Sequence, residues 1–320
     1  MARYRNALPQ LGGNLFLTDG GIETTLVFHE GVELPHFAAF HLMHDVEGKA
    51  LLRKCYSAYA DIAKAFKTGL ILEAPTWRAS ADWGQRLGYT PRMLENANRQ
   101  SVALLEGIRA AYEPEVTPLV ISGCLGPRED AYRLGNKMSA QGARHYHSAQ
   151  VQTFADTEAD MLCAMTLNYI DEGTGIALAA RDANMPLALS FTVETDGKLP
   201  EGPSLREAIE QVDQQTDGYP QYYMINCAHP SHFEAVLSDD AGPWLKRVRG
   251  IRANASSKSH AELDEATELD SGDPKALAAQ YAGLKRHHDQ LNIFGGCCGT
   301  DAHHVREIAR ACAPLFASAG

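Results

Sequence analysis

The stretch Leu291-Asn292-Ile293-Phe294-Gly295-Gly296-Cys297-Cys298-Gly299-Thr300, near the C-terminus, predicts a buried strand followed by a bend. Its first four residues form a short, mostly apolar run, and the glycines that follow weaken a regular strand and let the backbone turn. Adjacent cysteines cannot both face one side of a strand, but a Gly-Gly bend can direct both sulfurs toward one ion. We interpret Cys297 and Cys298 as metal ligands, and the alternative is two incidental buried thiols.

The same pattern of an apolar run that ends at polar residues, glycine or proline recurs through the chain. It predicts further strands at residues 15–17, 69–76, 117–123, 161–166, 186–193, 223–227 and 248–254. Apolar residues at three- and four-residue spacing predict helices between the strands, at about 48–66, 94–108 and 139–157. Three further helices are predicted: one that ends near residue 183, one that begins at 204 and one that begins near 302. Eight alternating units predict a parallel (β/α)8 TIM barrel, an α/β fold, with residues 1–320 as a single domain.

The composition is that of an ordinary globular protein, with 45% hydrophobic and 22% charged residues. A net charge of −11 without a basic cluster disfavours nucleic acid as a partner. The chain has no long apolar run, so we expect neither a signal peptide nor a membrane span. We therefore expect a cytoplasmic protein. Seven cysteines without framework spacing predict reduced thiols. The sequence leaves a homo-oligomer open.

Candidate site residues follow the predicted strand ends. In a parallel barrel these ends meet at one mouth, where the chemistry of such folds takes place. Asp19, Glu73, Cys227 and the Cys297–Cys298 pair all fall there. Cys227 is the best candidate for a third thiolate, although a lone cysteine can also be a small core residue.

Three thiolates with one open position would make Zn²⁺ a weak Lewis acid whose natural further ligand is another sulfur. This arrangement favours activation of a substrate thiol over generation of hydroxide. We expect Cys55, Cys124, Cys163 and Cys312 to be packing residues. His229 is expected in a surface turn rather than as a fourth ligand, and the histidine pairs at 287–288 and 303–304 on exposed helix faces.

The motifs Asp19-Gly20-Gly21, Asn226-Cys227 and Gly295-Gly296-Cys297-Cys298-Gly299-Thr300 together resemble the homocysteine S-methyltransferase family, over about residues 16–308. That family includes betaine- and S-methylmethionine-dependent enzymes and is a zinc-binding (β/α)8 barrel. The resemblance implies zinc held by Cys227, Cys297 and Cys298, the catalytic centre, with the homocysteine sulfur as a further ligand. It also implies that Asp19 lies near the substrate amino group. The candidate substrate contacts are Asp19, Gly20, Gly21, Glu73, Thr76 and Asn226.

One position departs from the family pattern. The family commonly has Glu-Thr at the end of the fourth strand, where the glutamate helps to hold the amino acid, and this chain has Met165-Thr166. Glu73 could replace the missing acid from a neighbouring strand. The alternative is that Glu73 pairs with Arg78 or with a helix lysine.

The expected function is zinc-dependent transfer of a methyl group from a sulfonium or quaternary ammonium donor to homocysteine, which gives methionine. Trp77, Trp83 and nearby tyrosines could hold a cationic donor by cation–π contact. Three alternatives stay open: the same chemistry on another thiol acceptor, a zinc hydrolase or lyase on the same barrel, and a non-catalytic barrel that binds zinc or a thiol.

Overall fold

The computed structural model describes residues 2–116, 118–132, 135–239, 242–265 and 268–316. Within these ranges eight parallel strands close into a barrel, because each strand pairs with the next along the chain and β8 pairs with β1. The strands are β1 Phe16–Leu17, β2 Gly69–Glu73, β3 Leu119–Leu125, β4 Met161–Leu167, β5 Leu187–Phe191, β6 Tyr222–Asn226, β7 Val248–Ala253 and β8 Ile293–Gly296. The predicted (β/α)8 TIM barrel is confirmed.

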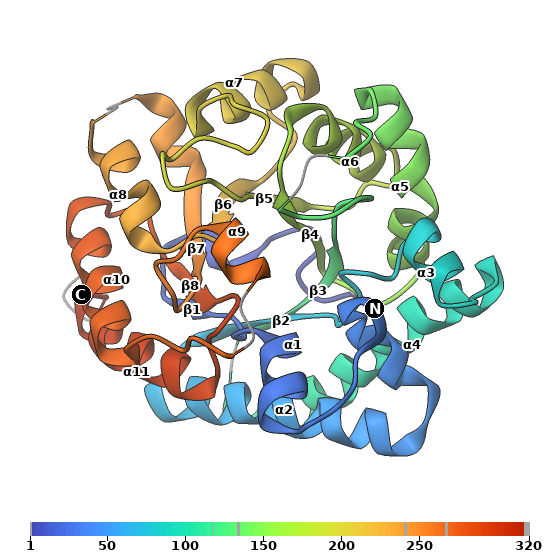
Figure 1. The fold of residues 1–320 in the computed structure, drawn as a ribbon. Helices are drawn as coiled ribbons and strands as arrows, with labels where there is room; N and C mark the ends of the chain where they lie inside the picture. The colour runs from blue at the N-terminus through green and yellow to red at the C-terminus, as the bar shows by residue number, and fades with distance from the viewer. Residues whose placement is uncertain (1, 117, 133–134, 240–241, 266–267, 317–320) are drawn as a thin grey trace.

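Most of the helices surround the barrel, which Figure 1 shows along its axis, while α9 (His260–Asp264) lies over its mouth. The other helices are α1 Ile22–Thr24, α2 Val46–Phe66, α3 Ala81–Arg86, α4 Pro91–Tyr112, α5 Ala140–Ala155, α6 Ile170–Asp182, α7 Leu205–Thr216, α8 Pro230–Asp239, α10 Pro274–His287 and α11 Ala302–Cys312. No helix of the described residues is long and apolar enough to cross a membrane.

Local sequence explains where these helices begin. The Asp45 side chain accepts a hydrogen bond from Gly48 N and caps α2, whose buried face includes Tyr56 and Tyr59. A capping box begins α7, since Ser204 and Glu207 each bond to the other's backbone. Side-chain caps and an apolar face thus agree with the helical periodicity in the sequence.

Strand β8 continues two residues beyond the predicted run, through Gly295 and Gly296. The end of β1 approaches very closely here, because a Cβ on Gly295 would overlap the Thr18 hydroxyl. Gly295 is therefore needed because β1 and β8 pack so closely at this point. It does not end strand β8, although the sequence had indicated this. The bend comes one residue later than the sequence indicated, at the cysteines.

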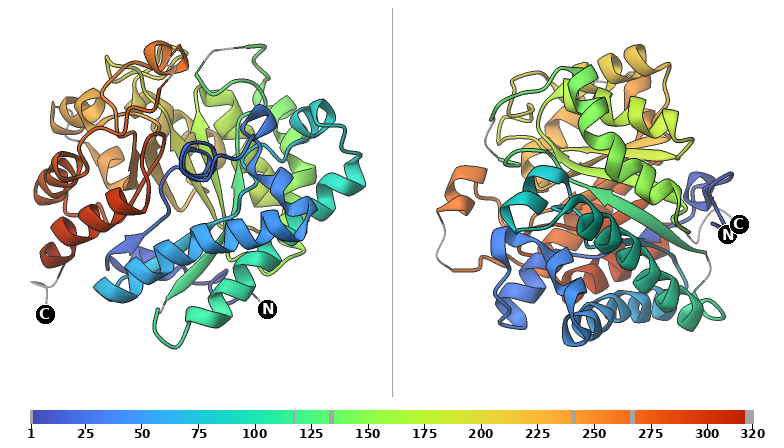
Figure 2. Two further views of the ribbon diagram at one scale, coloured as in Figure 1. Left: turned by 60° about the horizontal axis from the view of Figure 1, so that its bottom comes forward. Right: turned by 90° about the vertical axis from the view of Figure 1, so that its right-hand side faces the viewer.

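The two ends of the barrel differ. The N-terminal segment covers one end, where the Arg3 and Tyr4 amides donate to Asp160 Oδ1 over 2.7 and 2.9 Å. On the opposite end lies α9, within the long polar loop between β7 and α10 (Figure 2). The carboxyl ends of the strands open there, so side chains that follow the strands face this loop.

The expectation of exposed histidine pairs is correct for His287 and His303 and wrong for their neighbours, His288 and His304. His303 and His304 are successive residues of α11 and point to different sides of it, whereas His288 lies just beyond the end of α10 and is buried there. His304 packs inward, where Nδ1 lies 2.8 Å from Asp301 Oδ1 and Nε2 lies 2.8 Å from the Ser271 carbonyl oxygen. Its polarity is satisfied by these local contacts.

Candidate metal centre and substrate pocket

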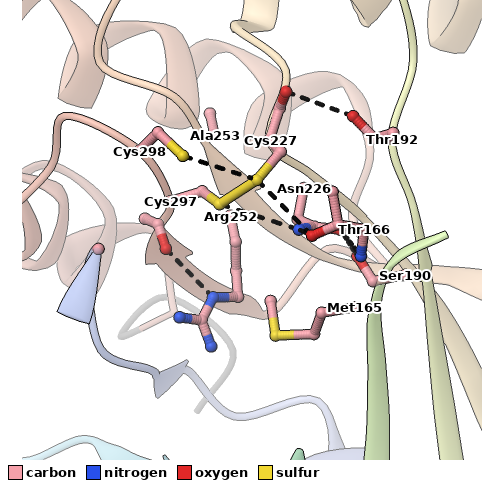
Figure 3. Close-up of a disulfide and its surroundings, with 12 residues drawn as sticks. Met165, Thr166, Ser190, Thr192, Asn226, Cys227, Arg252, Ala253, Cys297 and Cys298 are labelled. Atoms are coloured by element: carbon pink, nitrogen blue, oxygen red, sulfur yellow. Dashed lines mark hydrogen bonds between the residues drawn. A yellow bond between two sulfur atoms is a disulfide. The ribbon is translucent and has the colours of Figure 1, made fainter. Parts of the chain in front are cut away.

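Three cysteine sulfurs meet at the mouth of the barrel (Figure 3). Cys227 directly follows β6, and Cys297 and Cys298 directly follow β8. All three Sγ atoms lie within 4.8 Å of one another, and the Cys227 and Cys298 sulfurs are 4.0 Å apart. Barrel closure therefore brings together residues that are about 70 positions apart in the sequence.

Strand β7 holds the cysteines in place, because it lies between β6 and β8 and bonds to both. The Cys227 amide donates to the Arg252 carbonyl oxygen over 3.2 Å, and the Cys297 amide donates to that of Ala253 over 2.9 Å. The Cys298 carbonyl oxygen accepts from Ala255 N over 3.0 Å. Cys227 has a φ of 54°, a left-handed conformation that turns the chain at the strand end.

Two of the three sulfurs are bonded to each other, since the structure joins Cys227 and Cys297 as a disulfide. The expectation that all cysteines are reduced is thus wrong for this pair. The remaining thiols are free, and Cys55, Cys124, Cys163 and Cys312 are buried, as packing residues should be. Barrel closure places these two sulfurs side by side although they are 70 residues apart, which the sequence alone did not indicate.

The donor set fits a zinc ion once this disulfide is reduced. Tetrahedral coordination with Zn–S bonds of about 2.3 Å places ligand sulfurs roughly 3.8 Å apart, close to the separation of Cys227 and Cys298. Polar groups surround the sulfurs: Tyr132 Oη lies 3.1 Å from Cys298 Sγ, and Thr166 Oγ1 donates to Cys227 Sγ over 3.7 Å. Such outer donors orient ligands and stabilise thiolate charge.

Beside the cysteines lies a cavity of about 400 Å³. Its wall is built from the carboxyl ends of β2, β3, β4, β6 and β7 and from residues that follow β1, β2, β3, β6, β7 and β8. The loop after β7 contributes Ser256 and residues 263–264 and 268–270. Asp19, Gly20, Gly21 and Glu73 line the cavity, as do Asn226 and Met165. The sequence-predicted residues therefore surround one space, with the exception of Thr76.

Thr76 and Asn226 have structural contacts of their own. Thr76 is fully buried outside the cavity wall, and its hydroxyl donates to the Cys124 carbonyl oxygen over 2.7 Å. The Asn226 amide oxygen accepts from Thr166 N over 2.9 Å and from Ser190 Oγ over 2.6 Å. Asn226 thereby ties β6 to β4 and β5 immediately before the first cysteine.

The floor of the cavity carries a buried charge cluster. Asp19 Oδ1 lies 2.5 Å from Arg252 Nη2, and Glu73 Oε1 lies 4.0 Å from Nη1. Desolvation raises the pKa of Glu73 to about 7, and it also raises the pKa of Asp19 in spite of the nearby guanidinium. Burial alone would lower the pKa of Arg252, but the charges of Asp19 and Glu73 raise it.

Arg78 does not pair with Glu73. Its Nη1 donates to the Glu129 carbonyl oxygen over 3.1 Å, and its guanidinium lies 4.1 Å from the ring centre of Trp77 and 3.8 Å from that of Trp83. Arg78 thus already occupies faces of both indoles, and Trp83 is not part of the cavity wall. The expectation that Trp83 holds a cationic donor is therefore wrong.

Sequence reasoning missed Arg252, Glu23 and Tyr132, all of which line the cavity. Desolvation raises the pKa of the Glu23 carboxyl to about 7. A signal for Arg252 was present, because a charged residue inside a predicted buried strand is seldom there without a partner. Tyr132 lies in a loop without periodicity, and nothing in the sequence places it beside Cys298.

Comparison with known proteins agrees with this geometry. The family model described as homocysteine S-methyltransferase matches residues 16–312. The chain belongs to this family. Membership places it among methyltransferases and confirms the resemblance drawn from the cysteine and Asp-Gly-Gly motifs.

Relatives and solved structures show the same likeness. Homocysteine S-methyltransferase 4 of Zea mays is 22% identical over 93% of this chain and 90% of its own length. Homocysteine S-methyltransferase 3 of Arabidopsis thaliana is 24% identical over 55% of this chain. The match spans 50% of the length of that relative. The metallated form of the homocysteine methyltransferase MmuM from Escherichia coli superposes with a TM-score of 0.71, at 18% identity, over 95% of this chain and 98% of MmuM. Its oxidized form gives a TM-score of 0.73, at 20% identity, over 96% and 99%.

Proposed function

We propose that this protein is a zinc-dependent methyltransferase that moves a methyl group from a cationic donor to the thiol of homocysteine, which gives methionine. The observation that carries the proposal is the convergence of the Cys227, Cys297 and Cys298 sulfurs within 4.8 Å on the wall of a cavity. Bound zinc would supply the positive charge that keeps an acceptor thiol deprotonated near neutral pH.

The protein's own groups hold the reactants in place. Asn226 Nδ2 donates to Cys297 Sγ over 3.9 Å, and Thr166 and Tyr132 hold the Cys227 and Cys298 sulfurs through the contacts described above. The cavity floor binds the amino-acid part of the acceptor, while the cysteines at its wall fix the position of the thiol. Two reactants held in one cavity react as if they were one molecule, and this contribution to methyl transfer can be large.

Support for a cationic donor comes from the outer part of the cavity. Its lining includes Glu23, Asp130, Asp264, Glu268 and Asp270, together with the partly exposed rings of Phe28 and Phe37. Carboxylates and aromatic faces both favour a sulfonium or quaternary ammonium group over a neutral methyl donor. We therefore propose S-methylmethionine, S-adenosylmethionine and betaine as the donor panel.

The test is zinc content and thiol methylation of the reduced protein, measured for the wild type and for Cys298→Ala. We expect the variant to lose bound zinc and at least a hundredfold in methyl transfer, because one ligand of three is removed. Cys312→Ala is the matched control, since Cys312 is a buried thiol in α11 outside the cavity. A Cys298→Ala protein that retains both zinc and full turnover would show the site assignment to be wrong.

The same measurements separate the alternatives. Zinc and homocysteine binding without turnover for any donor would favour the non-catalytic barrel. A hydrolase or lyase would need histidine or carboxylate ligands, and among the described residues the three cysteines are the group of ligand atoms close enough to hold an ion.

A further inference from the structure

Arg252 lies at the floor of the cavity and is the group there that no predicted function accounts for. It is 4% exposed, sits near the end of β7, and lines the same cavity as Asp19, Glu73 and Met165. An arginine buried to this degree is retained when its hydrogen-bonding groups are used. The hydrogen-bond partners of the three guanidinium nitrogens therefore show which N–H donors remain available to a ligand.

Two of the three guanidinium nitrogens are engaged by the protein. Nε donates to the Gly296 carbonyl oxygen over 3.2 Å. Nη2 donates to the Gly20 carbonyl oxygen over 3.4 Å and forms the ion pair with Asp19. Nη1 has no hydrogen-bond partner, and Glu73 Oε1 lies 4.0 Å away from it. One nitrogen with two N–H donors is thus free at the edge of the cavity.

The chemistry of this free nitrogen selects an anionic group. Guanidinium nitrogens bind carboxylates through short, charge-assisted hydrogen bonds. On the β4 side the cavity presents the apolar side chain of Met165, which offers no acceptor for an ammonium group. Figure 3 shows Met165 and the Arg252 guanidinium on the same side of the cysteine cluster. The floor of this cavity therefore has an apolar side chain on the β4 side and an unused donor for a carboxylate on the β7 side.

We propose that Arg252 Nη1 binds the carboxylate of the acceptor thiol, and that this protein selects its acceptor by the carboxylate more than by the amino group. The inference rests on the proposed thiol methylation and specifies which part of the acceptor is recognised. Glu73 does not oppose it, because a carboxyl group with a raised pKa is partly protonated at neutral pH and can donate a hydrogen bond to the bound carboxylate.

Two analogues of homocysteine separate the contributions of its charged groups. 4-Mercaptobutyrate keeps the thiol and carboxylate and lacks the amino group, whereas 3-aminopropane-1-thiol keeps the thiol and amino group and lacks the carboxylate. We expect the wild type to methylate 4-mercaptobutyrate with a kcat/KM at least tenfold above that of the aminothiol. The reverse order would overturn the proposal. Failure to methylate any of the three thiols would instead refute the proposed function.

Substitutions then assign the preference to Arg252. Arg252→Gln should lower kcat/KM at least tenfold for homocysteine and for 4-mercaptobutyrate, and less than threefold for the aminothiol. Arg252→Lys, which keeps the charge, should fall in between. An equal loss for all three thiols would show that Arg252 only supports the barrel, through its contacts with Gly296 and Gly20.

Met165→Glu provides a second test that leaves the Arg252 contacts in place. A new carboxylate in the cavity should compete for Nη1 and attract an ammonium group. We expect the ratio of kcat/KM for 4-mercaptobutyrate to that for the aminothiol to fall at least tenfold. An unchanged ratio would count against the proposal even if the Arg252 variants did not fold.

Discussion

Glu73 shows how burial sets the charge of a single side chain in this protein. It is 4% exposed, its Oε2 atom has no hydrogen-bond partner, and desolvation raises its pKa to about 7. The folded state therefore keeps a proton that the unfolded chain loses near pH 4.5. Because the folded state binds more protons between these two values, stability is lost as the pH rises from about 4.5 through 7.

Replacement of Glu73 by glutamine should remove this loss. We expect Glu73→Gln to raise the free energy of unfolding at pH 8 by on the order of 1–3 kcal/mol, and the gain should shrink below about pH 5. Denaturant unfolding at several pH values measures this, with Glu33→Gln on the surface as the control for net charge. A variant that is less stable than the wild type at pH 8 would mean that the contact with Arg252 outweighs the cost of burial.

Single residues were predictable where their type alone limits what they can do. Adjacent cysteines framed by glycines predict a site without any knowledge of contacts, whereas Asp19 before Gly20-Gly21 is as well explained by a turn. Arg252 and Tyr132 could not be placed, because their roles depend on which strands and loops become neighbours when the barrel closes. The partner of Glu73 was misjudged for the same reason: Arg78 is near in sequence, but Arg252 is near in space.

At the scale of elements, α11 directly follows the paired cysteines and depends on a cap. Asp301 accepts hydrogen bonds from the His303 and His304 amides over 2.9 and 3.2 Å. The hydrogen bond from the His304 side chain, together with these backbone bonds, lowers the pKa of Asp301 to about 2. A depressed pKa stabilises the fold above the unfolded value of 3.8, and this stability is lost as the pH falls through about 2.

Removal of the cap should loosen the helix that follows the metal centre. We expect Asp301→Ala to lower the free energy of unfolding by about 1 kcal/mol at pH 7 and by less near pH 2. Asp301→Asn keeps a capping side chain and should lose less than half as much. Thermal unfolding at both pH values measures the difference, and equal losses for the two variants would show that the cap itself contributes little.

The segment between β1 and α2 is the element that we expect to contact the methyl donor. Phe28 and Phe37 are 51% and 57% exposed, and both line the cavity. His36 and Phe37 both have positive φ values, of 54° and 55°, so the chain adopts an unfavourable conformation where it presents the Phe37 ring. Large apolar side chains left exposed at a cavity are typical of ligand contacts.

A change of Phe37 to leucine keeps the apolar surface and removes the aromatic face. We expect Phe37→Leu to raise the KM for a sulfonium or ammonium donor by about 3- to 30-fold and to leave the KM for the acceptor thiol within twofold. Met93→Leu, at an exposed residue of α4 away from the cavity, is the control. Steady-state kinetics with each substrate varied in turn measure both KM values. A change in the KM for the acceptor thiol with an unchanged KM for the donor would contradict the prediction.

For the whole molecule, the order of elements was easier to predict than their ends. Buried parallel strands read as nearly continuous apolar runs, and their alternation with helices suffices for a barrel. Strand β8 extended further than predicted, because the close approach of Thr18 to Gly295 depends on the neighbouring strand. Long-range contacts decide such boundaries, and they are absent from a local pattern.

Bound zinc should couple to the stability of the whole barrel. The three ligands come from the ends of β6 and β8, which β7 separates, so an ion would link three adjacent strands at the mouth of the barrel. The unfolded chain cannot gather these thiols, since Cys227 and Cys297 are 70 residues apart. Binding to the folded state alone stabilises it by roughly 4 kcal/mol when free zinc is a thousand times the dissociation constant.

We therefore expect zinc to raise the Tm of the reduced protein by on the order of 5–10 °C, and a chelator to reverse the shift. The protein must first be treated with a phosphine reductant, because Cys227 and Cys297 cannot both act as thiolate ligands while they form a disulfide. Cys298→Ser should abolish most of the shift, whereas Cys312→Ala should keep it. A zinc-dependent shift of equal size in the Cys298→Ser protein would place the ion elsewhere, since the two remaining thiols cannot supply the same binding energy.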